Sequence, residues 1–295
     1  MGLAVSGGPD SLALLLLAHA ALPGRIEAAT VDHRLRPESV DEATMVARIC
    51  ADLAVPHAIL PVSVEPGNVS AEARVARYDA LEGWLAARGL AALATAHHAD
   101  DQAETLLMRL NRGSGVAGLA GVRAVGVSPG GAPLIRPLLG WRKAELQGIV
   151  DGVGLIAAVD PSNADPRYDR ARVRAQLSAT DWIDPLALAT SAAHLADADE
   201  AIEWAAQGEW DRQVAVNGAE ITYRPQAPRA VRLRVLARAI GLLGGDARGS
   251  AIARLDQALL AGQAANLGGV LAQPRGAAWV LRPEPARRTP GHDLK

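Results

Sequence analysis

The chain has one cysteine, no phenylalanine and no long hydrophobic run. Cys50 is the single cysteine among 295 residues. Alone it forms no internal disulfide, and it supplies neither a cysteine-rich metal site nor the ligands of an iron–sulfur cluster. The longest apolar run, Leu12–Ala18, is far too short to cross a bilayer, and no basic segment of the kind that opens a signal peptide precedes it. We therefore expect a cytoplasmic protein without disulfides.

An excess of one charge is also missing. The 30 basic and 32 acidic residues leave a formal net charge of −2, so global charge does not indicate a nucleic-acid-binding protein. Evidence for nucleic-acid binding must therefore come from local clusters of basic residues. Six tryptophans and three tyrosines leave few rings on which unpaired bases could stack. The length and the 49% hydrophobic content are sufficient for a sizeable core and favour two domains.

Through about residue 160, short apolar segments alternate with longer amphipathic ones. This alternation is typical of βαβ units in a mainly parallel sheet. It predicts an α/β domain over residues 1–184, with helices on both faces of the sheet. The expected strands are 3–5, 26–32, 58–62, 90–95 and 155–159, and the expected helices are 10–20, 38–53, 70–88, 100–111 and 142–151.

The pattern changes after Pro185. One long helix is expected over residues 185–215 as a link to a second, smaller and mostly helical domain over 216–295. Within that domain, residues 228–243 and 249–260 are predicted to be helical. Two apolar stretches then flank residues 273–276 in the manner of a terminal hairpin.

A polar and glycine-rich segment, SGGPDS, joins the first expected strand to the first expected helix. Backbone N–H groups and the positive end of a helix dipole converge at such a turn, which makes it a ready site for phosphate. Its glycines allow close approach of a ligand, its proline presets the first helical turn, and its serines offer hydroxyl groups. A capped turn without a ligand favours the same residues, so that alternative stays open. The segment lacks the lysine of a Walker A loop and the spacing of GxGxxG.

Polar residues also follow the second and fourth expected strands. Asp32 and His33 end the second strand, and the sequence HHADD begins at His97. Ligands of open α/β sheets bind at this edge, although an aspartate there can be only a turn former. Two histidines and two aspartates would also suit a transition-metal or phosphohydrolase site. The neighbouring glycine-rich turn favours carboxylates that hold Mg²⁺ on a nucleotide.

Three arginine-rich stretches are candidates for phosphate contacts. A run of charge is usually a solvated face, and a GC-rich genome alone would enrich arginine. The arginines of the last stretch could also pair with acids elsewhere in their domain. The spread of the three stretches over both expected domains would let them follow an RNA backbone. They comprise Arg109, Arg112, Arg123, Arg136, Arg142 and Lys143; then Arg167, Arg170, Arg172 and Arg174; and last Arg224, Arg229, Arg232, Arg234 and Arg238.

These motifs together resemble those of a known superfamily. SGGPDS matches SGGxDS, the pyrophosphate loop of the N-type ATP pyrophosphatases, at each fixed position. Further segments over about residues 2–180 resemble the tRNA(Ile)-lysidine synthetase family. They are VDHRLRPES, AHHADDQAETLLMRLNRGSGVAGLAGV, IRPLLGWRKAEL and DPSNADPRYDRARVR.

The resemblance implies a PP-loop ATPase fold of Rossmann-like type and a ligase reaction with ATP and Mg²⁺. ATP would adenylylate the C2 oxygen of the wobble cytidine of tRNA(Ile) with a CAU anticodon, and free lysine would then displace AMP to give lysidine. A thiolating enzyme of the superfamily is an alternative, but it needs persulfide cysteines or an iron–sulfur cluster. A nonenzymatic nucleotide-binding module would require the loop but not the paired acids.

The resemblance implies catalytic and nucleotide-binding residues, and the arginine-rich stretches supply the expected tRNA contacts. The expected catalytic residues are Asp32, His97, Asp101 and Arg112, and the expected Mg²⁺ ligands are Asp10 and Asp101. The expected tRNA contacts are Arg170, Arg172, Arg174, Arg229, Arg232 and Arg234, the last three in the smaller domain. ATP binding falls on Ser6, Gly7, Gly8, Pro9, Asp10 and Ser11.

Overall fold

The computed structural model describes residues 1–34, 38–63, 69–158, 167, 169–247 and 249–284. The chain forms two compact units, Met1–Ala196 and Asp197–Lys295, and each has its own hydrophobic core. The division falls within helix α8 (Pro185–Gln213), so the long helix is confirmed while the domain limits at 184 and 215 stay predictions. In the described ranges, every helix is too short or too polar to cross a membrane.

The first unit is built on a six-stranded sheet with the order β3-β2-β1-β4-β6-β5. Neighbouring strands are parallel, except that β5 runs antiparallel to β6. The strands expected before residue 96 are all present, with ends that differ by up to three residues. Their bounds are β1 (Gly2–Ala4), β2 (Glu27–Asp32), β3 (His57–Pro61), β4 (Leu93–Ala94), β5 (Val125–Val127) and β6 (Pro133–Ile135).

The strand expected over residues 155–159 is wrong where the structure describes it, because residues 155–158 are irregular and 159 lies outside the described residues. The Ala158 N–H donates to the Gly7 carbonyl at 2.9 Å, so this segment lies against the glycine-rich loop instead of extending the sheet. The sheet is completed by β5 and β6. Both are only three residues long and glycines separate them, which left no clear strand pattern in the sequence.

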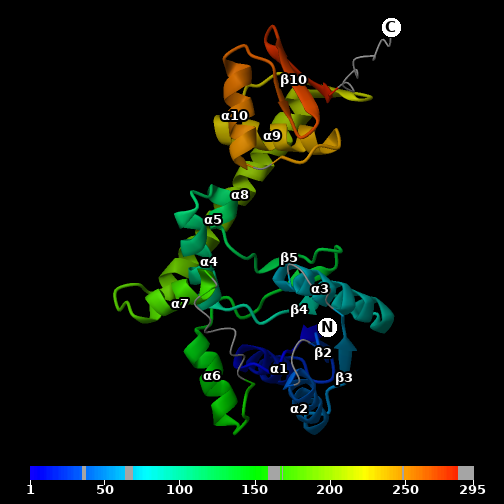
Figure 1. The fold of residues 1–295 in the computed structure, drawn as a ribbon, viewed down its shortest axis with the longest axis vertical. Helices are drawn as coiled ribbons and strands as arrows, with labels where there is room; N and C mark the ends of the chain where they lie inside the picture. The colour runs from blue at the N-terminus through cyan, green and yellow to red at the C-terminus, as the bar shows by residue number, and fades with distance from the viewer. Residues whose placement is uncertain (35–37, 64–68, 159–166, 168, 248, 285–295) are drawn as a thin grey trace, which may run out of the picture. The chain divides into compact units, whose positions relative to one another are not determined.

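Helices cover both faces of this sheet, as expected. Side chains alternate along the strands, so Leu3 and Ala28 pack into one cluster with α1, α2 and α6, while Ala29 and Leu93 pack into another with α3. Figure 1 shows these helices around the strands. Their bounds are α1 (Pro9–Ala21), α2 (Glu38–Asp52), α3 (Val69–Arg88), α4 (Ala99–Asn111), α5 (Val116–Leu119), α6 (Lys143–Gly152) and α7 (Asp169–Ser178).

The strand order creates a binding crevice. Strands β2 and β3 lie on one side of β1, and β4 lies on its other side, so the connections after β1 and β4 lead to opposite sides of the sheet. Open α/β sheets bind ligands at such a switch point, outside the carboxyl ends of the strands. The glycine-rich loop follows β1 and the HHADD segment follows β4, so the topology brings both motifs to this crevice.

The second unit contains a five-stranded antiparallel sheet with the order β7-β8-β11-β10-β9. Helices α9 (Arg229–Leu242) and α10 (Gly249–Leu260) pack together, and α10 contacts β9 and β10 (Figure 1). Both helices and the β10–β11 hairpin were expected, whereas the other three strands were not. The strand bounds are β7 (Val214–Asn217), β8 (Glu220–Tyr223), β9 (Ala265–Leu267), β10 (Val270–Arg275) and β11 (Ala278–Pro283).

Candidate functional site

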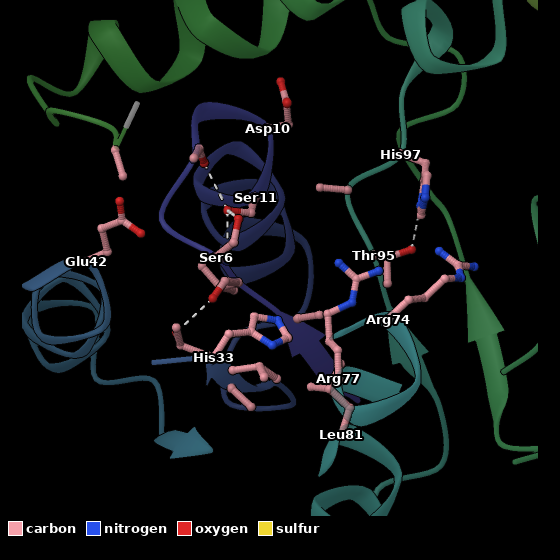
Figure 2. Close-up of a pocket in the computed structure, with 18 of the residues that line it drawn as sticks. Ser6, Asp10, Ser11, His33, Glu42, Arg74, Arg77, Leu81, Thr95 and His97 are labelled. Carbon is pink, nitrogen blue, oxygen red and sulfur yellow. Dashed lines mark hydrogen bonds between the residues drawn. The ribbon is translucent and has the colours of Figure 1, made fainter. Parts of the chain in front are cut away.

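A cavity of about 570 Å³ lies at the switch point between β1 and β4. Its lining includes Ser6, Asp10 and Ser11 from the glycine-rich loop and the start of α1, and Thr95 and His97 from the segment after β4. Figure 2 shows these groups converging from separate elements. The volume lies in the range of small-molecule and cofactor sites.

The glycine-rich loop has the backbone geometry of an anion site. Gly7 has φ +90°, and a Cβ atom there would come within 3.1 Å of the Met45 side chain, so a larger residue would be both strained and crowded. Gly8 is the N-cap residue of α1 and Pro9 begins the helix. Among the described residues, no side chain caps this first turn, which leaves its backbone N–H groups available for an anion.

The two serines of the loop have different surroundings. The buried Ser11 hydroxyl accepts a hydrogen bond from the Ser6 backbone N–H at 3.1 Å and donates one to the Gly8 carbonyl at 2.9 Å. The exposed Ser6 hydroxyl lies 3.2 Å from it. Ser11 therefore holds the loop in shape, and the Ser6 hydroxyl lies on its open side.

A buried histidine joins the first turns of α1 and α4. Nε2 of His98 lies 3.5 Å from Oδ2 of Asp10 and 3.5 Å from Oδ2 of Asp101, and Nδ1 lies 3.6 Å from Oδ2 of Asp100. Burial by itself would lower the pKa of His98, but the three carboxylates outweigh it and raise the pKa to about 9. At neutral pH His98 is therefore a cation that holds these acids together.

Two carboxylates of this group could bind a cation in the cavity. Asp10 and Asp101 both line it, and Oδ1 of Asp10 is buried without a hydrogen-bond partner among the described residues. A buried carboxylate oxygen without a partner is costly unless a ligand satisfies it. Mg²⁺ is usually bound by one or two carboxylates together with phosphate and water, which fits this pair. Within the described ranges, no three acids, histidines or cysteines form a metal cage of protein ligands alone.

His97 is a neutral group in the wall of the cavity. Its Nδ1 lies 3.0 Å from Oγ1 of Thr95. Burial lowers the pKa of His97 to about 4; the charge of Asp101 opposes this shift and the neighbouring arginines 136, 77 and 170 add to it. At pH 7 the imidazole is uncharged. It can form hydrogen bonds in the cavity without repelling a cation bound by Asp10 and Asp101.

Asp32 stabilises the turn after β2. Oδ1 of this buried side chain accepts hydrogen bonds from the Ser39 hydroxyl at 2.7 Å and from the Arg34 backbone N–H at 2.9 Å. The Ser39 bond, with help from Arg34 and against the effect of burial, lowers the pKa of Asp32. His33 lines the cavity instead, and its Nδ1 is buried without a hydrogen bond to any described residue. The turn-forming role is thus observed, and a catalytic role of Asp32 stays a prediction.

Arg112 does not line the cavity in this structure. It ends α4 at the surface, where its Nη2 lies 2.9 Å from Oδ2 of Asp169, and the same aspartate also pairs with Arg172. More than half of each of these side chains is exposed. A catalytic role of Arg112 and a tRNA contact of Arg172 would require these side chains to leave Asp169. Both roles stay predictions.

Glu104 of α4 fixes the other two arginines of α7. This carboxylate is only 1% exposed; Nε of Arg174 lies 2.6 Å from Oε1, and Nε of Arg170 lies 3.3 Å from Oε2. Arg170 also lines the cavity. We expected these arginines to contact tRNA, but Glu104 was missed. The clue in the sequence was a single acid between Ala103 and Thr105 of the expected helix. The structure shows that α4 buries all three residues.

The glycine-rich segment after α4 is folded by side chains of α4 itself. Nη1 of Arg109 donates to the carbonyls of Gly118 and Gly121. The Gln102 amide exchanges two hydrogen bonds of 2.7 Å with the backbone of Val122. Nη1 of Arg109 therefore satisfies backbone carbonyls, and a phosphate contact by the rest of its guanidinium stays a prediction.

Sequence reasoning also missed the contribution of α3. Arg74 and Arg77 line the cavity, and their guanidinium carbons lie 5.0 and 5.2 Å from the centre of the Tyr78 ring. Their spacing of three residues places both on one helix face. The segment carries no glycine-rich or strand-end signal, so the sequence alone gave no reason to place it at the site.

In the second unit, two of the arginines expected to contact tRNA form ion pairs with acids of the same unit. Arg232 makes a two-point contact with the fully buried Asp256, with N–O distances of 2.9 and 3.1 Å, and Arg234 pairs with Asp199. These pairs match the alternative left open for this cluster. Arg229 is 56% exposed and lies 3.9 Å from Asp256, so it is the most accessible of the three.

Comparison with known proteins gives consistent matches. Residues 1–180 match the PP-loop domain family. The tRNA(Ile)-lysidine synthase of Novosphingobium aromaticivorans is 46% identical, with 97% of this chain and 90% of the relative covered. That of Zymomonas mobilis is 40% identical, with 98% and 89% covered. The U34-tRNA thiolase NcsA of Methanococcus maripaludis shares the fold, with a TM-score of 0.54 at 18% identity over 66% of this chain and 70% of the thiolase.

Proposed function

Because the chain belongs to the tRNA(Ile)-lysidine synthase family and carries its PP-loop domain, we propose that it ligates lysine to tRNA(Ile) in an ATP-dependent reaction. The observation that carries the proposal is the glycine-rich loop, which meets Asp10 and Asp101 in one cavity at the switch point of the sheet. The proposed product is lysidine at the wobble position of a CAU anticodon, and AMP and pyrophosphate are released.

In the first proposed step, the C2 oxygen of the cytidine attacks the α-phosphorus of ATP. A new P–O bond forms, the bond to the bridging oxygen breaks, and pyrophosphate leaves. The backbone N–H groups of the loop and the Ser6 hydroxyl bind the departing phosphates. Asp10 and Asp101 would hold Mg²⁺, which neutralises charge on the phosphates when bound.

In the second proposed step, the uncharged ε-amine of free lysine attacks C2 of the adenylylated cytidine. A C–N bond forms, the C2–O bond breaks, and AMP carries the oxygen away while the amine loses its proton. His97 has too low a pKa to store that proton at pH 7, so its proposed role is to orient groups in the cavity through hydrogen bonds.

Thiolation, the alternative within the superfamily, has no support in the chemistry of Cys50. The side chain is fully buried, and burial raises its pKa to about 11. Nucleophilic sulfur chemistry needs an accessible thiolate. A buried, protonated thiol does not carry a persulfide to tRNA.

The proposed function is tested by incubating the protein with radiolabelled lysine, ATP and a tRNA(Ile) transcript that has a CAU anticodon. We expect label in the tRNA and one AMP for each lysine incorporated. The matched control is the same transcript with uridine in place of the wobble cytidine, which should stay unlabelled. Equal labelling of both transcripts, or none of either, would contradict the proposal.

A further inference from the structure

We propose that Arg74 and Arg77 of α3 form the site that recognises the α-carboxylate of the free lysine substrate. This inference rests on the proposed function and deepens it, because neither the family motifs nor the glycine-rich loop indicates where the amino acid binds. It concerns the wall of the cavity that α3 provides.

Both arginines face the site already described. They line the same cavity as Thr95 and His97, and Figure 2 shows all four side chains grouped on one side, with Glu42 on the opposite side and Ser6 and Ser11 between. Arg77 shares the cavity lining with His33 and His97, and its charge lowers the pKa of both rings. The two arginines therefore belong to the inner wall of the site.

The positive charge of this wall has no acidic partner in the part of the chain that the structure describes. Arg88, Arg142 and Arg174 each pair with a carboxylate, but Arg74 and Arg77 form no ion pair there and instead rest on the ring of Tyr78. Neighbouring guanidinium groups repel each other, so a concave wall of this kind favours an anion.

Among the anions of the proposed reaction, a carboxylate fits this wall best. The phosphates of ATP already have the loop of Ser6–Ser11 and the cation held by Asp10 and Asp101. A planar guanidinium matches a carboxylate in a two-point contact, which a point charge such as lysine's ammonium does not. The adjoining lining includes Leu81 and Ala96, which offer apolar surface to the methylene chain of a lysine. With its carboxylate on α3, the substrate can extend its ε-amine towards the loop.

This assignment predicts which feature of the amino acid the protein selects. A substrate that lacks the carboxylate, 1,5-diaminopentane, keeps the reactive amine and the methylene chain. It should be incorporated with a kcat/KM about ten to a hundred times lower than that of lysine, the range expected for loss of a charged hydrogen-bonding partner.

The test compares lysine with 1,5-diaminopentane in the unaltered protein and in R74Q, R77Q and R77K. Adenylylation is followed separately as pyrophosphate release with tRNA and ATP but no amine. We expect R74Q and R77Q to raise KM for lysine about tenfold or more, to leave adenylylation unchanged, and to lose most of the preference for lysine. R77K keeps the charge and should lie between. The matched control is R48Q, because Arg48 is an exposed residue of α2 outside the cavity lining and should change nothing.

Two results would overturn the assignment. One is an unaltered protein that uses both amines equally well, which needs no variant and so does not depend on the variants folding. The other is R74Q or R77Q that loses adenylylation or tRNA affinity while it keeps the preference for lysine, since the arginines would then bind a phosphate of ATP or of the anticodon. An unaltered protein that incorporates neither amine would overturn the proposed function itself.

Discussion

The two serines of the glycine-rich loop have different proposed roles: Ser11 maintains the shape of the loop, and Ser6 contacts phosphate. Ser11 is buried and bonded to the loop backbone, whereas the Ser6 hydroxyl is exposed. S6A should therefore raise KM for ATP about tenfold with no change in melting temperature. S11A should raise KM for ATP further, by about tenfold to a hundredfold, and also lower the melting temperature because the loop loses two hydrogen bonds. Steady-state kinetics and thermal unfolding of both variants test this, and unchanged ATP kinetics in both would be inconsistent with it.

Asp101 is the residue on which the proposed Mg²⁺ site depends most. In D101N an amide replaces a charged carboxylate. Its oxygen can still accept the hydrogen bond from the His98 backbone N–H, which is 3.2 Å long in the native protein. Adenylylation should fall by about a hundredfold or more, while the fold stays intact. The measurement is pyrophosphate release across a magnesium titration. A variant that matched the parent at each magnesium concentration would remove Asp101 from the site.

The His98 cluster makes stability depend on pH in the alkaline range. The folded pKa of about 9 lies above the value near 6.5 of an unfolded histidine, so the stabilisation is complete below about pH 6.5 and is lost as the pH rises through 9. The expected loss is about 3 kcal/mol of unfolding free energy. Urea unfolding between pH 6 and 10, without magnesium, measures it. H98Q should be less stable at pH 6 and should lose this part of the slope; the same slope in both proteins would contradict the cluster's role.

At the scale of elements, Glu104 is a buried link between α4 and α7. The carboxylate is buried and pairs with Arg170 and Arg174, so E104Q leaves two guanidinium groups without their anion. We expect a loss of about 1 to 3 kcal/mol of stability, measured by urea unfolding, because both guanidinium groups keep partial access to solvent. The matched control is D169N, which breaks only the exposed pairs of Arg112 and Arg172 and should cost far less stability, because solvent screens these pairs. Equal losses in the two variants would show that Glu104 has no special role.

The elements that the sequence predicted well are those with a strong local signal. The amphipathic periodicity of α2 to α4 and the apolar run of α1 predicted these helices. The glycine-rich turn after β1 was predicted from its residues, because the positive φ of Gly7 is a local requirement. Strands β5 and β6 have three residues each and form only through pairing with β4 and with each other. Their existence depends on tertiary contacts that a pattern of single residues does not contain.

The same distinction applies to the site. The strand-end rule brought Asp10, His97 and Asp101 into one crevice, because topology alone decides which loops meet there. It did not separate Asp32 from His33, since burial and the Ser39 bond decide which side chain faces the cavity. The partnership of Arg232 with Asp256 joins residues of two helices, so no local pattern revealed it.

At the scale of the whole molecule, we propose that the first unit binds ATP and that the second unit contributes part of the tRNA-binding surface. Arg229 is the most accessible of the three expected tRNA contacts on α9, so R229A should weaken tRNA binding and reduce the slope of log affinity against log salt by about 0.7 to 0.9. Affinity for ATP should not change. R232A is not an equivalent test, because it leaves the buried Asp256 without its partner and destabilises the unit. Filter binding over several salt concentrations decides; an unchanged slope and affinity would mean that Arg229 does not contact tRNA.

The central claim concerns a single nucleoside, and mass spectrometry of that nucleoside tests it most directly. After reaction with ATP and lysine, tRNA(Ile) with a CAU anticodon is digested and its wobble nucleoside is weighed. The account predicts a cytidine that is heavier by one lysine less one water, since AMP carries away the C2 oxygen. An unmodified cytidine, or one in which sulfur has replaced the C2 oxygen, would contradict it.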